Sequence, residues 1–225
     1  DVMEEIRLIE VKEGILSEND ARAEELRQKL KAIRTYVLNL MASPGAGKTS
    51  LILQTIHALK GRCRIGVLEA DIDSVVDAET VSRTGVEVVQ LRTGGFCHLD
   101  ATMVARGLEE LDLDSLDLVI VENVGNLVCP AEFDTGAVAS AMILSVPEGD
   151  DKPLKYPLMF TRCSALVVNK IDALELFDFN LDLLQERAGQ LNPDLSVLPV
   201  SCRTGEGIQA WVDWLESQVQ DFVQV

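Results

Sequence analysis

The chain is short of basic residues, and this shortage limits the partners that it can have. It carries 20 Lys and Arg against 37 Asp and Glu among 225 residues, which sets its formal charge at −17. Such an acidic protein is repelled by the phosphates of nucleic acids and of anionic membranes. We therefore expect neither nucleic acid nor a membrane as its main partner.

Long apolar runs, an export signal and a disulfide pattern are also missing. No apolar run approaches the roughly twenty residues of a membrane-spanning helix, and residues 1–5, which are mostly acidic, do not resemble a signal peptide. The five cysteines are an odd number and lie scattered along the chain, so they predict no disulfide framework. A reducing, cytoplasmic location is the expectation that follows.

What the chain does contain is a series of short apolar runs between helical patterns. With 225 residues and 47% hydrophobic content, it is long enough to bury one full core. The runs are nearly continuous in Val, Ile and Leu, which is typical of strands buried on both faces. They predict an α/β fold with a mostly parallel seven-stranded sheet flanked by helices, at residues 36–41, 64–69, 86–91, 118–121, 141–146, 166–169 and 197–200.

Two helices are predicted outside the regular alternation. Residues 17–33 indicate a helix capped by Ser17, with an apolar face made by Leu26, Leu30 and Ile33. The last segment repeats apolar residues at helical spacing, at Ile208, Trp211, Val212, Leu215 and Val219. We expect residues 1–34 to form a helical extension and residues 35–225 to form one domain.

The segment Ala42-Ser43-Pro44-Gly45-Ala46-Gly47-Lys48-Thr49 is the most informative part of the sequence. It lies between a predicted strand and a predicted helix, which is the setting of a phosphate-binding P-loop. Backbone N–H groups around Gly45, Ala46, Gly47 and Ser50 would surround the phosphates of a nucleotide. Lys48 would reach the β- and γ-phosphates as a catalytic group, and the Thr49 hydroxyl would bind Mg²⁺.

The P-loop pattern has one departure. Its first position is usually Gly and is Ala42 here. The alternative interpretation is a glycine-rich loop before an ordinary helix, and the flanking strand and helix favour phosphate binding over it.

A guanine-reading motif follows the sixth predicted strand. In Asn169-Lys170-Ile171-Asp172, the Asp172 carboxylate would accept hydrogen bonds from guanine N1–H and its 2-amino group, donors that adenine does not offer there. Asn169 would bind the base and its loop, and the Lys170 stem would pack on the purine. Ser201 and Cys202 lie in the loop after the seventh strand, where a backbone N–H would meet guanine O6. Alone, the motif also occurs in ordinary surface loops; downstream of a P-loop it favours GTP.

Acidic residues at two strand ends predict a magnesium site. Asp71 ends the second strand and Glu122 the fourth, and ligands of such sheets bind beyond the carboxyl ends of strands. Both are candidates to bind Mg²⁺ beside Thr49 and to act in catalysis, and the alternative for each is a solvated strand end. Gly125 would sense the γ-phosphate through its N–H. Either Asp73 or Asp77 would orient the attacking water.

Two thiols and one imidazole predict a second metal site. Cys97 and His98 follow the third strand, and Cys129 follows the Glu122 loop. Sulfur and nitrogen ligands suit Zn²⁺ or Ni²⁺, although a cysteine in such a loop is more often a small buried residue. Both loops leave the nucleotide edge of the sheet, which favours the metal interpretation. The remaining candidates are interpreted as structural: Cys63, Cys163, Cys202 and His57.

These segments together resemble the HypB family of hydrogenase maturation GTPases, which take part in nickel insertion. The resemblance is carried by residues 122–130 (ENVGNLVCP), 95–100 (GFCHLD) and 148–157 (EGDDKPLKYP), and it extends over about residues 37–218. It implies a dimerising P-loop NTPase of the SIMIBI class that binds GTP and Mg²⁺. It also implies a Zn²⁺ or Ni²⁺ site formed by Cys97, His98 and Cys129 at or near the dimer interface.

The resemblance further implies partners and a cycle. GTP would favour a homodimer, and hydrolysis would release nickel to hydrogenase maturation factors and the hydrogenase large-subunit precursor. Some family members carry an N-terminal Cys-rich motif or a His-rich tract; these 225 residues contain neither and hold two His, so no nickel-storage segment is expected in them. Met142, Phe160 and residues 173–177 are interpreted either as dimer surface or as ordinary core.

Three alternatives remain at this point. A urease-type nickel GTPase has a similar sequence, but the Val128-Cys129-Pro130 segment argues against it. A P-loop kinase for a small molecule is disfavoured by the guanine motif. A metal-storage protein with a regulatory nucleotide site is the alternative outside the enzymes.

Overall fold

The apolar runs form a single parallel sheet, as the sequence predicts. The computed structural model describes residues 11–71 and 76–224. Its sheet has seven strands in the order β3-β2-β4-β1-β5-β6-β7, and every pairing is parallel. The strands are β1 Tyr36–Ala42, β2 Ile65–Asp71, β3 Glu87–Arg92, β4 Leu118–Glu122, β5 Ala139–Ser145, β6 Ala165–Asn169 and β7 Ser196–Pro199. The α/β fold class and the position of each strand are therefore confirmed, with ends shifted by one or two residues.

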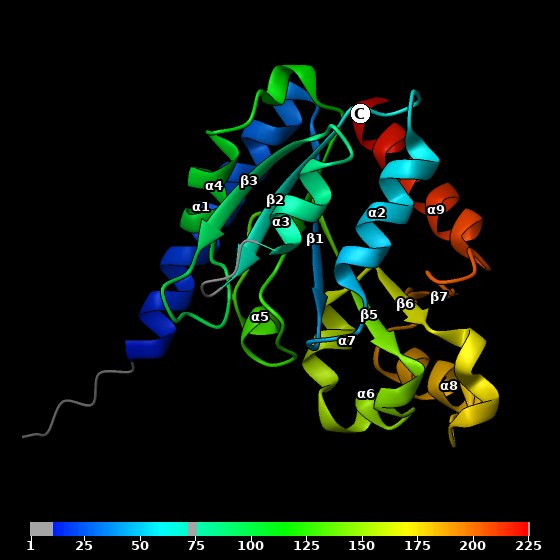
Figure 1. Cartoon of the computed structure of the whole chain (residues 1–225). Coiled ribbons are helices and arrows are strands. Elements are labelled where there is room, and N and C mark those ends of the chain that lie inside the picture. The colour runs from blue at the N-terminus through cyan, green and yellow to red at the C-terminus, as the bar shows by residue number, and fades with distance from the viewer. Residues whose placement is uncertain (1–10, 72–75, 225) are drawn as a thin grey trace, which may run out of the picture.

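Helices cover both faces of the sheet (Figure 1). On one face α2, α3 and α9 pack against the largest apolar cluster. On the other face α1 and α4 share one cluster, and α7 and α8 share another. The helices are α1 Val11–Ile33, α2 Lys48–Leu59, α3 Val76–Ser82, α4 Ala101–Leu108, α5 Cys129–Glu132, α6 Lys152–Lys155, α7 Pro157–Arg162, α8 Leu181–Leu191 and α9 Ile208–Gln224, with 3₁₀ turns at Leu113–Ser115, Val146–Glu148 and Ile171–Leu176.

The central strand β1 has a polar residue on one of its apolar faces. Leu38 and Leu40 face the α2 and α9 side, whereas Val37 and Met41 face the opposite side. Asn39 lies between Val37 and Met41, so alternation places its side chain on that same opposite side, where the two smaller clusters meet. It is 2% exposed. A buried amide must find hydrogen-bond partners there.

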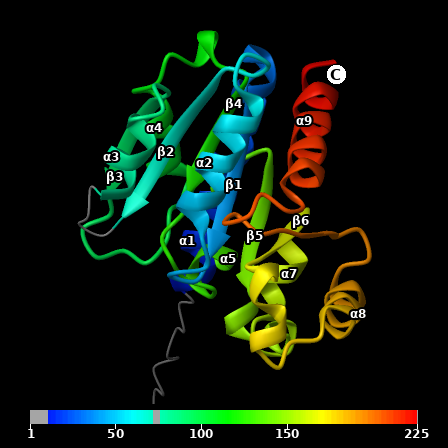
Figure 2. The same ribbon diagram turned by 45° about the vertical axis from the view of Figure 1, so that its right-hand side comes forward.

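The C-terminal helix follows its predicted pattern. All five residues of its apolar face are buried, and α9 lies beside α2 in both views (Figure 2). The Trp211 indole N–H donates to the Thr55 hydroxyl at 2.8 Å, which satisfies the polar atom of this buried ring.

The first helix differs from its prediction at its start and in the burial of its last residue. It begins at Val11, so Ser17 lies inside α1 and is not its cap. Serine is only a modestly poor helix former, and no proline interrupts residues 11–16, so the helix continues past it. Leu26 and Leu30 are buried as expected, but Ile33 is 37% exposed because the helix ends there.

Two residues that the sequence assigned either to the core or to a dimer surface belong to the core. Met142 and Phe160 are fully buried in the cluster beneath α7 and α8. Leu176 and Phe177, by contrast, are exposed. Among the described residues, none of the helices is both long and apolar enough to cross a membrane.

Candidate functional site

A glycine-rich turn joins β1 to α2 at the carboxyl edge of the sheet. Gly45 and Gly47 have φ values of 78° and 107°, a region that favours glycine, and Gly47 directly precedes Lys48, the first residue of α2. A Cβ on Gly47 would lie 2.3 Å from the Asn169 Nδ2 atom. Glycine is required there both by its backbone angle and by the close approach of the Asn169 loop.

The conformation of Ala42 shows why glycine is not needed at the first position of the P-loop. Ala42 is the last residue of β1 and is fully buried, and its φ is not positive. Nothing in its conformation needs glycine. Ala46 is also buried, at 1% exposed, so its methyl group belongs to the core and only its backbone faces the turn.

A pocket of about 560 Å³ opens beside this turn. Strand ends and the start of α2 bring together residues far apart in the sequence, because all strands point the same way. The wall contains the predicted residues Gly45, Gly47, Lys48, Thr49, Ser50, Asp71, Glu122 and Gly125, and also Asp77. Asp73, the other candidate for orienting water, lies outside the described residues.

A pair of buried carboxyl groups lies next to this pocket. Glu69 and Glu122 are directly opposite each other in the β2–β4 register and are 3% and 4% exposed. Burial, followed by the neighbouring Glu122 carboxyl group, raises the pKa of Glu69 to about 10. Burial also raises the pKa of Glu122, against the opposing effect of Lys48. The sequence analysis missed Glu69, since only the strand register shows that it faces Glu122.

The oxygen atoms around this pair fit a divalent cation. The Thr49 hydroxyl donates to Glu122 Oε1 at 3.3 Å. Within the described residues, Glu69 Oε1 and Glu122 Oε2 are buried acceptors with no hydrogen-bond partner. Hydroxyl and carboxylate oxygens are the protein ligands that Mg²⁺ prefers, and a cation would remove the cost of two buried acidic groups.

The Glu122 loop crosses the phosphate turn at close range. A Cβ on Gly125 would lie 3.0 Å from Pro44 Cγ and 3.2 Å from the Pro44 backbone nitrogen. The Asn126 N–H donates to the Ala42 carbonyl at 2.9 Å, which holds the loop against the end of β1. A shift of either loop would therefore displace the other.

The guanine-motif residues meet at the next part of the sheet edge. The Asn169 side chain donates to the Ala46 carbonyl at 3.0 Å and accepts from the Cys202 N–H at 3.1 Å, so it joins the phosphate turn to the last loop. Lys170, with φ of 67°, donates from Nζ to the Gly45 carbonyl at 2.7 Å. Asn169 is 2% exposed, and its side chain makes hydrogen bonds to backbone groups of Ala46, Lys170 and Cys202, so it positions loops.

Asp172 has an accessible carboxylate in the same place. It accepts from the Ser201 hydroxyl at 2.7 Å and lies 3.4 Å from an Arg203 guanidinium nitrogen. The Ser201 hydrogen bond is the main reason that the pKa of Asp172 is lowered, so it is ionised at neutral pH. An ionised acceptor at this position suits a base with two adjacent N–H donors.

The two predicted thiols and the imidazole are brought together. The ligand atoms of Cys97, His98 and Cys129 lie within 4.8 Å of one another. The sulfur atoms are 2.7 Å apart, and Cys97 Sγ is 3.9 Å from His98 Nδ1. These residues lie on the loop after β3 and at the first residue of α5, so tertiary structure supplies the proximity that the spacing alone does not. The donor set is that of Zn²⁺ or Ni²⁺ sites.

The surroundings of this cluster suit metal binding. The His98 ring stacks on Phe133 with centroids 3.8 Å apart, which fixes its orientation. Partial burial lowers the pKa of His98, so the imidazole is neutral near pH 7 and keeps a lone pair for a metal. Phe96 and Val128 flank the cluster and are 56% and 52% exposed.

The other candidates stay apart from the cluster. Burial raises the pKa of Cys63 to about 12 and that of Cys202 to about 11, and it raises the pKa of Cys163 as well, so these thiols are protonated at neutral pH. All five cysteines are free. His57 is exposed near the end of α2.

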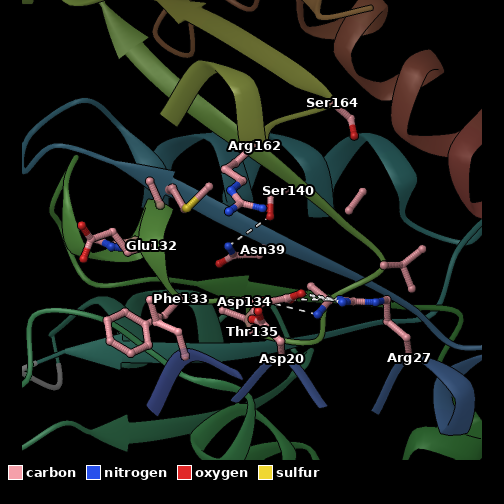
Figure 3. A pocket seen from close by; sticks show the side chains of 17 residues that line it. Asp20, Arg27, Asn39, Glu132, Phe133, Asp134, Thr135, Ser140, Arg162 and Ser164 are labelled. Atoms are coloured by element: carbon pink, nitrogen blue, oxygen red, sulfur yellow. Dashed lines mark hydrogen bonds and ion pairs between the residues drawn. The ribbon is translucent and has the colours of Figure 1, made fainter. Parts of the chain in front are cut away.

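A second pocket, of about 340 Å³, lies between α1, α5 and α7 (Figure 3). Asn39 and Ser140 lie on its floor, Phe133 on one wall, and the Arg162 guanidinium points toward Ser140. Arg27 is paired with Asp134 by hydrogen bonds of 2.9 and 3.0 Å. No sequence motif marks this pocket, because its residues come from separate elements.

Comparison with known proteins identifies relatives across most of the chain. Residues 36–199 match the profile of the CobW/HypB/UreG nucleotide-binding domain. The hydrogenase maturation factor HypB of Rhizobium leguminosarum bv. viciae is 46% identical over 214 residues, which cover 95% of this chain and 72% of the relative.

Solved structures agree with this result. A crystal structure of HypB from Helicobacter pylori in complex with nickel superposes with a TM-score of 0.86 at 34% identity, covering 91% of this chain and 96% of that one. The signal recognition particle receptor FtsY from Elizabethkingia anophelis shares the fold alone, with a TM-score of 0.54 at 16% identity over 90% of this chain and 76% of that one. The chain therefore belongs to the CobW/HypB/UreG family of P-loop nucleotide-binding domains and, within it, to the HypB hydrogenase maturation factors.

Proposed function

We propose that this protein is a GTPase that couples its nucleotide state to nickel delivery during hydrogenase maturation. The observation that carries the proposal is the Cys97, His98 and Cys129 cluster, whose Cys129 loop also holds Glu122 in the nucleotide pocket. Relatives named hydrogenase maturation factors, and a nickel complex of one of them, support the choice of metal and process. We treat residues 1–34, of which residues 1–10 lie outside the described part of the chain, as an N-terminal helical extension of the domain assigned to residues 35–225.

The nucleotide part of the proposal assigns roles within the pocket. Backbone N–H groups at Gly45, Ala46, Gly47 and Ser50 bind phosphate oxygens, and Lys48 neutralises the β- and γ-phosphates. Thr49, Asp71 and Glu122 hold Mg²⁺, with Glu69 as an added ligand or as a hydrogen-bond partner of Glu122. Bound Mg²⁺ supplies positive charge to the transferring phosphoryl group. Asp77, which lies in the pocket wall, is the candidate for orienting the attacking water. The Gly125 N–H senses the γ-phosphate.

The base is guanine in this proposal. The Asp172 carboxylate accepts from N1–H and the 2-amino group, and a backbone N–H of the loop with Ser201 and Cys202 meets O6. The Lys170 stem packs on the purine, and Asn169 holds this loop to the phosphate turn. An adenine nucleotide would leave the Asp172 carboxylate unpaired.

The metal part of the proposal links two copies of the chain. GTP orders the loops around Asp71 and Glu122 and favours a homodimer, in which two clusters of Cys97, His98 and Cys129 lie close together. Hydrolysis relaxes the loops and releases nickel to maturation partners and the hydrogenase large-subunit precursor. We place this cycle in the cytoplasm, where the free thiols that bind Ni²⁺ or Zn²⁺ stay reduced.

Nickel affinity measured in two nucleotide states tests the proposal. A ligand shifts a two-state equilibrium only if it binds the states unequally. We expect different nickel dissociation constants with GDP and with a non-hydrolysable GTP analogue, and loss of this nickel binding in Cys129→Ser. The matched control is Cys63→Ser, which removes a thiol that lies outside the cluster. Equal nickel affinities in the two nucleotide states would contradict the proposal.

A further inference from the structure

Asn123 is a fully buried polar residue between two loops: the loop after β4, which carries Gly125, and the loop after β3, which carries Cys97 and His98. It follows Glu122 at the end of β4 and precedes Val124, and it has no exposed surface. None of the functional roles proposed above uses its side chain. A buried primary amide is costly unless its donors and acceptors are satisfied, so its partners show what it does.

The Asn123 carbonyl oxygen accepts hydrogen bonds from both loops. Its Oδ1 receives the Leu99 N–H at 3.3 Å and the Val124 N–H at 2.8 Å. Leu99 directly follows His98, and Val124 directly precedes Gly125. One oxygen atom therefore contacts the residue next to a metal ligand and the residue next to the proposed γ-phosphate sensor.

The amide nitrogen anchors this arrangement to the sheet. Asn123 Nδ2 donates to Asn39 Oδ1 at 3.0 Å, and Asn39 Nδ2 donates to the Ser140 hydroxyl at 3.2 Å (Figure 3). The orientation of the Asn123 amide is determined by its neighbours, because two backbone N–H groups can only donate. Asn39 and Ser140 lie opposite each other on β1 and β5, so the anchor is part of the rigid sheet.

The geometry makes the two loops mechanically dependent. If the Val124 and Gly125 backbone shifts when a γ-phosphate binds, Asn123 either carries the Leu99 segment with it or leaves a buried N–H without a partner. An unsatisfied buried group is more costly than a small concerted shift. The Leu99 side chain is fully buried, so this segment moves as part of the packed interior.

We propose that Asn123 is a positioning residue that transmits the nucleotide state to the metal cluster through its shared hydrogen bonds with Leu99 and Val124. This inference rests on the proposed coupling of GTP and nickel. It assigns the transmission to one side chain that contacts neither ligand.

The test compares nickel affinity in two nucleotide states for Asn123→Ala, Asn123→Asp and the unaltered protein. The unaltered protein is expected to show a ratio of dissociation constants of about fivefold or more between the GDP and GTP-analogue states, and both variants are expected to reduce it below about twofold. Asn123→Asp keeps the two acceptor functions but loses the donor to Asn39, so it separates loss of the anchor from loss of volume. Asn192→Ala is the matched control, because its amide donates to the Phe160 and Cys163 carbonyls, which belong to neither loop.

Hydrogen exchange in the unaltered protein gives a second readout that needs no variant. The amide protons of Leu99 and Val124 are expected to change protection together when the GTP analogue replaces GDP. Two results would overturn this inference and leave the proposed function standing. One is a ratio of nickel dissociation constants that stays unchanged in folded Asn123 variants. The other is a protection of the Leu99 amide that does not change with the nucleotide while that of Val124 does. Equal nickel affinities in the unaltered protein would instead overturn the proposed coupling and this inference with it.

Discussion

At the scale of single residues, the buried pair of Glu69 and Glu122 determines how the stability of the metal-free protein responds to pH. Each carboxyl group lies in the interior, and the two share one register position on adjacent strands. Burial is the main reason that the pKa of each carboxyl group is raised, and the neighbouring Glu122 carboxyl group raises the pKa of Glu69 further. A divalent cation bound between the two carboxyl groups would favour the ionised forms.

We predict that Glu69→Gln removes a pH dependence of stability. In the metal-free folded chain the pKa of Glu69 is raised to about 10, whereas the unfolded chain releases this proton near the ordinary glutamate pKa. Rising pH then favours the unfolded chain, and the free energy of unfolding falls by up to about 1.4 kcal/mol per pH unit. Glu69→Gln cannot ionise, so its advantage over the unaltered protein should grow from about pH 6 to about pH 9.

Denaturant unfolding at several pH values, without metal, measures this difference. Repeating it with Mg²⁺ and GDP should abolish this trend for the unaltered protein, because the cation keeps the pair ionised in the folded chain as it is in the unfolded chain. Parallel stability curves for the two proteins in the metal-free state would show that Glu69 does not hold the proton.

We also predict that Asp172 selects the base. Asp172→Asn replaces one acceptor oxygen with a donor, so GTP should lose affinity by about 100-fold or more while xanthosine triphosphate gains. Calorimetric titration with both nucleotides measures the change. Arg203→Ala is a suitable control, because it removes a neighbour of the Asp172 carboxylate and leaves the carboxylate itself in place. An unchanged preference for GTP in Asp172→Asn would exclude this carboxylate as the base reader.

At the scale of elements, the close crossing of two loops links the nucleotide pocket to the thiol cluster. The turn before α2 and the loop after β4 touch at Pro44 and Gly125, and the second loop continues into α5, which begins with Cys129. The nucleotide pocket and the thiol cluster are therefore consecutive parts of one chain segment. A displacement at one end of such a short segment reaches the other end.

We predict that Gly125→Ala slows hydrolysis more than it weakens GDP binding. The new Cβ would lie within 3.3 Å of three Pro44 atoms, one of them backbone, so the loop must move away from the phosphate turn. Loss of alignment at the γ-phosphate should lower the single-turnover rate by about tenfold or more. Gly189→Ala is the matched control, since a Cβ there meets no atom within 4 Å. Equal rates for the two alanine variants would show that Gly125 does not need its close approach.

At the scale of the whole molecule, charge opposes self-association and an exposed apolar surface favours it. A formal charge of −17 per chain repels a second copy. Phe96 and Val128, which directly precede Cys97 and Cys129 in the sequence, offer exposed apolar surface. Because charge repulsion and apolar burial oppose each other, a bound nucleotide could shift the equilibrium between monomer and dimer.

We predict a nucleotide-dependent and salt-dependent dimer. Molar mass by light scattering should double with a GTP analogue and Mg²⁺, and the dimer should strengthen at high salt as the repulsion is screened. Lys48→Ala, which loses the phosphate contact, should stay monomeric under the same conditions. A monomer in every nucleotide state would remove the dimer from the proposed cycle.

Much of the fold and of the site followed from the sequence because the relevant signals are local. Continuous apolar runs mark strands that are covered on both faces, and the P-loop and guanine motifs are short segments whose chemistry does not depend on distant residues. The start of α1 was wrong because a serine is a possible cap and also a tolerable interior residue, and packing decides between them.

The sequence by itself determined the strands, the phosphate turn and the types of side chain available for GTP, Mg²⁺ and a soft metal. Only the tertiary structure decided which of these side chains meet: that Glu69 faces Glu122, that Cys97 and His98 reach Cys129, and that Asn123 joins their loops. The physical reason is that strand order and register place residues far apart in the chain at one edge of the sheet. No spacing along the chain records that placement.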